Sequence, residues 1–253
     1  MTFPIVLHVP HASTRIPVDV LDQFLIGREE LESENRLLTD HATDRIFRNA
    51  FPLANSVVFP VSRLAVDAER FIDDYQEPMA KTGMGVIYTH GTRRQPIRRD
   101  LTPEERGSLL SRYYHPHHQE LDQAVQRQLD EHGKCLILDC HSYPPEALPY
   151  EHHPDARRPE FCLGTDDFHS PEELISSVEN KLTAQKFSVA RNEPFRGCMV
   201  PTKYYQRDRR VRSLMIEVNR SLYLNHDFSL HEPGLERLIA VLQSLQSLLV
   251  SGL

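Results

Sequence analysis

The sequence has few cysteines, and they lie far apart. Its 253 residues include four, at Cys135, Cys140, Cys162 and Cys198. No two of them form a C-x-x-C pair, so the pattern indicates neither a zinc ribbon nor a disulfide framework. We expect all four to be reduced residues of the protein core.

The sequence also lacks a basic excess, an apolar leader and any Gly/Ser-rich linker. Its formal net charge of −7 argues against a nucleic-acid or anionic-membrane partner, because such surfaces need clustered lysine and arginine. The first residues, MTFPIVLHVPH, have no basic region, and their apolar run is too short for a signal peptide or a membrane span. We therefore expect a single cytoplasmic domain over residues 1–253 that acts on a small molecule, and we make no prediction of its oligomeric state.

Short apolar runs recur along the chain and predict strands. They are IVLHV (5–9), SVVFPVS (56–62), GVIYT (85–89), CLILDC (135–140), FCLG (161–164) and SLMIEVN (213–219). Several are apolar throughout, which is typical of strands that are covered on both faces.

Helical patterns lie between these runs. The longest, residues 102–133, opens with Thr102 as N-cap and Glu105 closing a capping box, and Pro116 is expected to kink it. Ser170 begins a second pattern in the same way, and residues 234–249 carry a Leu/Ile stripe. The alternation predicts a three-layer α/β fold, with helices on both faces of a central mixed, mainly parallel sheet.

In folds of this kind the reactive groups lie just past the carboxyl ends of strands. The ionisable residues found there are His11, Arg63, His141 and Glu217. In addition, Asp40 and Asp44 are spaced four residues apart after Thr39. We expect Thr39 to cap a helix that turns both carboxylates to one side.

Two histidines and an acidic residue suit a catalytic zinc site with an open position for water. Zinc lowers the pKa of that water to about 7, and a separate carboxylate must then take its proton. Glu217, which has apolar neighbours in the sequence, fits this role. Arg63 and Arg70 present guanidinium forks that suit an oxyanion or a carboxylate.

A structural role stays open for each of these residues. A lone histidine is often hydrogen-bonded for structure alone, and Asp40 and Asp44 also suit a helix N-terminus or solvent. Glu217 could pair with Arg220 or Arg212. The histidine tracts HPHH (115–118) and EHH (151–153) are expected to form a solvated kink and a Pro-rich loop, respectively, and not metal sites.

Seven motifs, in order along the chain, resemble the N-formylglutamate amidohydrolase family. They are HVPHAS, LTDHATDRIF, VSRLAVDAERF, YYHPHHQEL, LDCHSYP, PFRGCMVP and IEVNRSLYL, between His8 and Leu224. Members of that family are zinc-dependent amide hydrolases on the scaffold shared with zinc carboxypeptidases and aspartoacylases. The resemblance implies a zinc-peptidase architecture, one Zn²⁺ per chain and a place in histidine degradation.

The resemblance also implies a ligand set of two histidines and one acidic residue. His11 and His141 match the two histidines. The usual H-x-x-E element would place an acid at position 14, where this chain has Thr14. The role therefore shifts to Asp40, with Asp44 as the substitute.

The other roles that the resemblance implies concern the reaction and the substrate. Glu217 resembles the general base, Arg63 the arginine that polarises the scissile carbonyl, and Arg70 the one that grips a substrate carboxylate. In the D-x-N-R element this chain reads DAER, so Glu69 stands where asparagine is usual. Further expected substrate contacts are Arg196, Ser142 and Tyr143, and expected supports of the metal ligands are Asp44 and Asp139.

The expected reaction is hydrolysis of N-formyl-L-glutamate to formate and L-glutamate. Two alternatives stay open: a related zinc amidohydrolase or carboxypeptidase that acts on another acyl amino acid or peptide, and a metal-binding module without turnover. An arginase-like dinuclear hydrolase is disfavoured, because it would want an aspartate two residues after His141, where Tyr143 stands.

Overall fold

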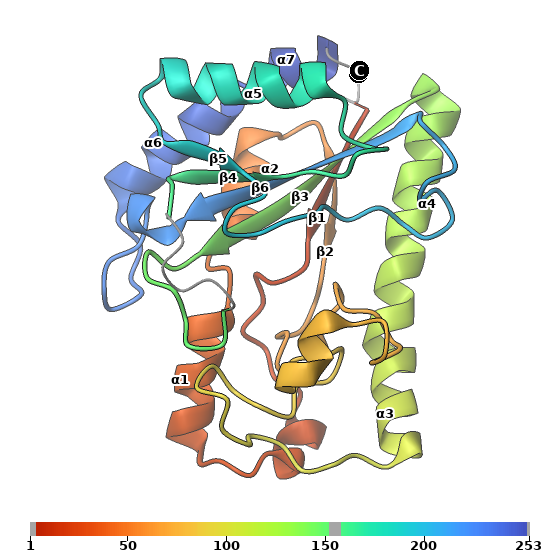
Figure 1. The fold of residues 1–253 in the computed structure, drawn as a ribbon, viewed down its shortest axis with the longest axis vertical. Coiled ribbons are helices and arrows are strands. Elements are labelled where there is room, and N and C mark those ends of the chain that lie inside the picture. The colour runs from red at the N-terminus through yellow and green to blue at the C-terminus, as the bar shows by residue number, and fades with distance from the viewer. Residues whose placement is uncertain (1–3, 152–157, 252–253) are drawn as a thin grey trace.

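The computed structural model describes residues 4–151 and 158–251, and these form one six-stranded sheet with helices on both faces (Figure 1). The strands are β1 (Ile5–Val9), β2 (Asn55–Val58), β3 (Cys135–Tyr143), β4 (Phe161–Gly164), β5 (Val189–Arg191) and β6 (Val211–Asn219). Their order across the sheet is β2, β1, β3, β6, β4, β5. β4 runs antiparallel to β6, and every other neighbouring pair is parallel, so the predicted mixed, mainly parallel sheet is confirmed.

The α-helices pack on both faces of this sheet or extend beyond it. They are α1 (Arg28–Leu38), α2 (Thr43–Ala50), α3 (Pro103–Leu109), α4 (His115–His132), α5 (Glu172–Ala184), α6 (Glu232–Gln243) and α7 (Gln246–Ser251). Shorter 3₁₀ turns span Val18–Gln23, Pro78–Thr82 and Arg220–Leu222. Within the described part of the chain, no helix combines the length and the apolar character that crossing a membrane would take.

The three layers follow from the alternation of side chains along the strands. In β1, Ile5, Leu7 and Val9 belong to a core cluster with α2, α5, α6 and α7. Val6 belongs to a second cluster on the opposite face, with α4 (Figure 1). Successive strand residues point to opposite faces, so His8 shares the α4 face with Val6. This alternation decides which polar side chains lie on the same face of the sheet and can contact one another.

One predicted strand is absent from the structure, and one strand of the structure was not predicted. Residues 85–89 form no strand but part of a turn, because the backbone reverses at Gly83 (φ 76°) and the Thr89 amide donates to the Gly83 carbonyl at 2.8 Å. The buried side chains of Val86 and Ile87 explain the apolar run, since they pack in a separate cluster away from the sheet. β5, with only three half-buried residues, carries too short an apolar run to be predicted.

The helix predicted over residues 102–133 forms, with its break earlier than expected. The Thr102 and Glu105 capping box is present, but a π-helical turn at Leu110–Tyr114 separates α3 from α4. Pro116 therefore lies in the first turn of α4, where its missing N–H is tolerated. His117 is only 3 % exposed, so the expected solvated kink is wrong at this residue, while His152 and His153 of the other tract lie outside the described residues.

Two predicted helix caps are wrong. Thr39 ends α1 and does not begin a helix, because the backbone at Ala42 turns into the left-handed region (φ 58°) and α2 starts only at Thr43. Ser170 precedes α5, but its hydroxyl donates to the Ser213 carbonyl at 2.6 Å and caps no helical N–H. The Thr39 hydroxyl donates to the Asn35 carbonyl within α1 at 2.7 Å and likewise caps no helical N–H. The four cysteines are free as expected, three of them buried and Cys198 half-buried.

Candidate active site

The strand-end residues gather around one cavity at the carboxyl ends of β1, β3 and β6. The cavity measures about 310 Å³. Most of the predicted site residues line it: His11, Asp40, Arg63, Arg70, His141, Ser142, Tyr143, Arg196 and Glu217. Asp44, in the first turn of α2, is not among the lining residues that the structure describes, and Asp139 lines a neighbouring cavity.

His11 follows β1, and its imidazole is fixed from one side. Its Nε2 lies 2.8 Å from Oδ1 of Asp67, a fully buried carboxylate. Its Nδ1 is buried and has no hydrogen-bond partner in the described part of the chain. A carboxylate that orients one ring nitrogen leaves the other free as a metal ligand, so Nδ1 is the atom of His11 that is available for a cation.

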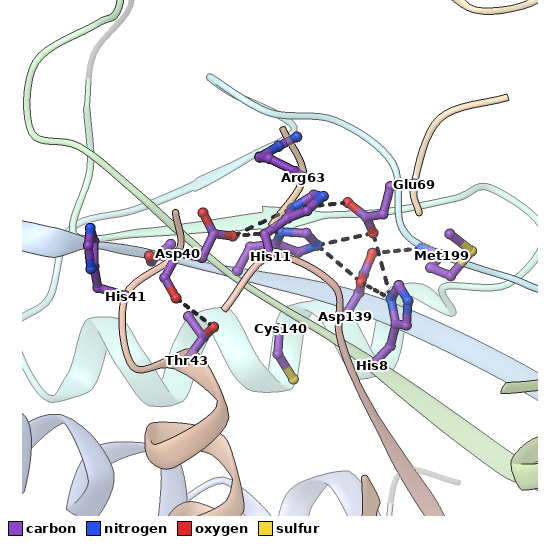
Figure 2. Close-up of polar contacts among 12 residues, drawn as sticks. His8, His11, Asp40, His41, Thr43, Arg63, Glu69, Asp139, Cys140 and Met199 are labelled. Carbon is purple, nitrogen blue, oxygen red and sulfur yellow. Dashed lines mark hydrogen bonds and ion pairs between the residues drawn. The ribbon is translucent and has the colours of Figure 1, made fainter. Parts of the chain in front are cut away.

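Asp40 lies in the turn between α1 and α2 and not in a helical turn, which corrects the expected position. Its amide donates to the His11 carbonyl at 3.0 Å, and its carbonyl accepts from the Thr43 hydroxyl at 2.9 Å. The Asp40 carboxylate is thereby placed with Oδ2 3.0 Å from Nδ1 of His141 and 3.8 Å from Nδ1 of His11 (Figure 2).

Glu69 is the carboxylate that sequence reasoning did not select as a ligand. Its Oε1 lies 3.1 Å from Nε2 of His141, and its Oε2 lies 3.7 Å from Nδ1 of His11. His11, Glu69 and His141 place their ligand atoms within 4.8 Å of one another. The sequence did contain a signal for this role: in the DAER element, Glu69 replaces the usual asparagine and so adds a carboxylate next to the site.

His141 has carboxylates at both ring nitrogens. Nδ1 faces Asp40 at 3.0 Å, and Nε2 faces Glu69 and Asp139, each at 3.1 Å. Burial alone would lower the pKa of His141, but the Glu69 and Asp139 carboxylates outweigh it and raise that pKa well above the usual value. A neutral imidazole donates from only one nitrogen, so this environment calls for a positive charge, either a proton or a metal ion.

Asp67 organises the arginines that face the cavity. Its Oδ2 accepts from Nη2 of Arg63 at 2.8 Å and from the Tyr88 hydroxyl at 2.7 Å, and Nε of Arg70 lies 3.6 Å away. Burial alone would raise the pKa of Asp67, but Arg63 and then His11 outweigh it and hold that pKa well below the usual range. Arg63 of the VSR motif and Arg70 of the DAER motif therefore both lie next to the ionised carboxylate of Asp67.

Arg220 is a second residue that the sequence did not place in the site. Its Nη2 donates to Oδ1 of Asp40 at 2.9 Å, and its Nε donates to the Ser142 hydroxyl at 3.2 Å. These bonds explain why Arg220 does not pair with Glu217. They also turn the Ser142 hydroxyl toward Arg220. The Tyr143 hydroxyl donates to the Pro159 carbonyl, so its ring alone is free to shape the cavity.

Glu217 stands beside His141, because β3 and β6 pair these two residues in register. It is 7 % exposed, and its Oε2 has no hydrogen-bond partner among the residues that the structure describes. Burial raises the pKa of Glu217 to about 8, although the charge of His141 opposes the shift. A carboxyl group with a pKa near neutrality can both accept and return a proton.

Comparisons with known proteins agree with this geometry. The family model for N-formylglutamate amidohydrolase matches residues 3–224. An N-formylglutamate deformylase of Pseudomonas aeruginosa is 28 % identical, covering 98 % of this chain and 94 % of its own length, and one of Pseudomonas putida is 27 % identical with 98 % and 93 % covered.

A solved structure is also similar along its whole length. The crystal structure of N-formylglutamate amidohydrolase from Ralstonia eutropha superposes with a TM-score of 0.82 at 25 % identity, covering 99 % of this chain and 94 % of that one. The structure of an Agrobacterium tumefaciens gene product shares the fold with a TM-score of 0.74 at 20 % identity, over 99 % and 91 % of the two chains. Because the family model spans most of its length, this chain belongs to the N-formylglutamate amidohydrolase family.

Proposed function

We propose that this protein hydrolyses the amide bond of an N-acyl amino acid and that its substrate is N-formyl-L-glutamate, giving formate and L-glutamate. The observation that carries the proposal is the buried carboxyl group of Glu217 next to His141, inside a cavity that arginines line. Its Oε2 has no hydrogen-bond partner within residues 4–151 and 158–251. The substrate identity follows the activity for which the relatives from the two Pseudomonas species are named.

The residues around His11 fit one zinc ion. Among the described residues, no group hydrogen-bonds to the buried Nδ1 of His11, and carboxylate oxygens of Glu69 and Asp40 lie 3.7 and 3.8 Å from it. Ligand atoms of a tetrahedral zinc site lie about 3.3 Å apart, given bonds of about 2.0 Å. His11, His141 and Asp40 would hold the ion, with Glu69 as a second carboxylate within reach. When bound, zinc supplies Lewis acidity and lowers the pKa of water.

The protein's own groups then have distinct tasks. Glu217 takes a proton from the attacking water and returns it to the departing amine. Arg63 lines the cavity, and its Nε and Nη2 both donate to Oδ2 of Asp67. Its Nη1 can then donate to the oxyanion that develops on the formyl oxygen. Because Asp67 fixes the guanidinium before the substrate arrives, little reorganisation is needed during the reaction.

Hydrolysis and its metal dependence are tested together. Purified protein should release formate from N-formyl-L-glutamate, lose this activity after chelation and regain it when Zn²⁺ is added back. His11→Asn and His141→Asn should bind less zinc and release no formate after the same treatment. Full activity in chelated protein that holds no metal would overturn the metal dependence.

A related amidohydrolase acting on another acyl amino acid is the second candidate, and Glu69 favours it. The Glu69 carboxylate lines the same cavity as the arginines and adds a negative charge where a dicarboxylate substrate must bind. A panel of N-formyl and N-acetyl amino acids with acidic, neutral and basic side chains separates the two candidates. Bound zinc with faster turnover of a neutral or basic substrate would select the second.

Arg196 offers a test of how glutamate is recognised. Its side chain is exposed and lines the cavity, so it is placed to meet the carboxylate of the substrate side chain. Arg196→Gln should raise KM for N-formyl-L-glutamate about tenfold or more, because a charge-assisted hydrogen bond is lost. With N-formyl-L-alanine, which has no side-chain carboxylate, the same substitution should leave KM unchanged. An equal rise for both substrates would argue against this contact.

A further inference from the structure

A second group of potential metal ligands lies beside the first, on the face of the sheet that α4 covers. His8 of β1 and Asp139 of β3 are paired in register, and Nδ1 of His8 lies 2.7 Å from Oδ1 of Asp139. Glu69 reaches the same point, with Oε1 3.6 Å from Nδ1 of His8. Figure 2 shows Asp40, His11, Glu69, Asp139 and His8 in one continuous row of side chains.

The charges of the described residues leave two carboxylates in this row without a permanent cation. Asp67 pairs with Arg63 and Arg70, and Asp40 pairs with Arg220. In the part of the chain that the structure describes, the ion pairs of Glu69 and Asp139 are all with imidazoles. Asp139 is buried and Glu69 is half-buried. Carboxylates that are withdrawn from water need a matching positive charge, so positive charge is missing where these two carboxylates meet.

α4 holds His8 in the orientation that a ligand needs. His117 of α4 lies with Nε2 2.9 Å from Nε2 of His8, and its ring packs edge-on against Phe59. This contact occupies the outer nitrogen of His8 and turns Nδ1 toward Asp139 and Glu69. A partner at the far ring nitrogen is how proteins commonly orient a ligating histidine.

The second group also has an entry path. Glu69 and Asp139 line a neighbouring cavity of about 420 Å³, and Glu69 lines the candidate active site as well. Oε1 of Glu69 lies 3.1 Å from Nε2 of His141 and 3.6 Å from Nδ1 of His8, and Oε2 lies 3.7 Å from Nδ1 of His11. One carboxylate therefore connects the two groups.

We infer that His8 Nδ1, Asp139 Oδ1 and Glu69 Oε1 bind a second divalent cation, and that Glu69 bridges it to the cation held by His11 and His141. Nδ1 of His8 lies 2.7 Å from Oδ1 of Asp139 and 3.6 Å from Oε1 of Glu69, and ligand atoms of all three residues lie within 4.8 Å of one another. Ligand atoms of a four-coordinate ion with bonds of about 2.0 Å lie about 3.3 Å apart. One imidazole and two carboxylates suit zinc or another first-row divalent metal. The inference concerns metal binding alone and does not depend on which amide is hydrolysed.

Metal stoichiometry tests the inference directly. Metal-free wild-type protein is titrated with Zn²⁺ in a calorimeter, and the zinc that it retains after dialysis is measured by mass spectrometry. We expect two Zn²⁺ per chain for wild type and one each for His8→Asn and His11→Asn. The matched control is His118→Gln, one residue from His117 in α4, whose ring bonds the Ala68 carbonyl and none of the proposed ligands; it should retain two.

Two results would overturn the second site: a wild-type protein that saturates at one Zn²⁺, or a folded His8→Asn variant that still binds two. If His8→Asn does not fold by circular dichroism, crystals of wild-type protein grown with Zn²⁺ decide the matter. A second anomalous peak within bonding distance of His8 and Asp139 supports the site, and a single peak at His11 and His141 contradicts it.

Discussion

Replacing Glu217 with glutamine is expected to lower kcat/KM for the hydrolysed amide by about 10²- to 10⁴-fold, the usual contribution of a general base. Glutamine keeps the shape of the side chain but cannot accept a proton. Because Glu217 is not among the candidate metal ligands, the zinc content should stay at the wild-type level. Loss of activity at constant metal content therefore separates proton transfer from metal binding.

The same substitution should stabilise the metal-free protein at neutral pH. Burial raises the folded-state pKa of Glu217 to about 8 from an ordinary value of 4.5. In the unfolded chain the group ionises as the pH rises through 4.5, whereas in the folded chain it stays protonated until about pH 8. Glu217 thus lowers the free energy of unfolding progressively across this window. Glutamine removes this dependence, so the gain in melting temperature should be absent near pH 4 and largest at pH 8.

Thermal unfolding of chelated protein between pH 4 and pH 8, together with formate release by the zinc-loaded form, measures both effects. Glu236→Gln makes the same chemical change at an exposed position of α6 and should alter neither. A Glu217→Gln protein with wild-type turnover would remove Glu217 from the mechanism. One that is inactive but also depleted of zinc would assign it to metal binding instead.

The sequence predicted the sheet well because its central strands are buried on both faces. β1, β3 and β4 are rich in apolar residues, and every residue of each is buried. Local sequence patterns predicted the wrong structure where contacts between distant parts of the chain determine the conformation. Val86 and Ile87 resemble a strand because they are buried, yet they pack in a cluster outside the sheet.

For the site, the rule that reactive groups follow strands located His11, His141 and Glu217, because parallel strands present their carboxyl ends at one edge. It could not locate partners that come from turns. Asp40 is placed by its backbone bond to the His11 carbonyl, and Arg220 reaches Asp40 across 180 positions of sequence. Glu69 and His8 depend on the packing of β1, β3 and α4, which no local pattern records.

Asp67→Asn is expected to weaken the fold and the site at once. The side chain is fully buried and bonds Arg63, Tyr88, His11 and the Glu69 amide. Asparagine carries no charge, so the substitution removes the negative charge that faces two arginines. Arg63 is hydrogen-bonded to this carboxylate, and Nε of Arg70 lies 3.6 Å from it. Leaving buried charges unpaired costs about 3–5 kcal/mol, so the free energy of unfolding at pH 7 should fall by about that amount.

The pH dependence of this loss has a definite sign. The pKa of Asp67 lies well below its ordinary value of 3.8 in the folded protein. The stabilisation from its ionised form is therefore complete above pH 3.8 and is lost as the pH falls through the folded-state pKa. The stability difference between wild type and Asp67→Asn should accordingly be constant from pH 5 to pH 8 and shrink in acid.

The metal affinity of Asp67→Asn should also drop, by about 10- to 100-fold, because the carboxylate that orients His11 is gone. Asp44→Asn is the matched control, since it makes the same change at a half-buried aspartate that does not line the cavity. Its stability should stay within about 0.5 kcal/mol of wild type, with unchanged zinc affinity. If Asp67→Asn and Asp44→Asn had the same stability and the same zinc affinity, Asp67 would have no special role in the site. The proposal that Asp67 fixes Arg63 in place to stabilise the oxyanion would then be wrong.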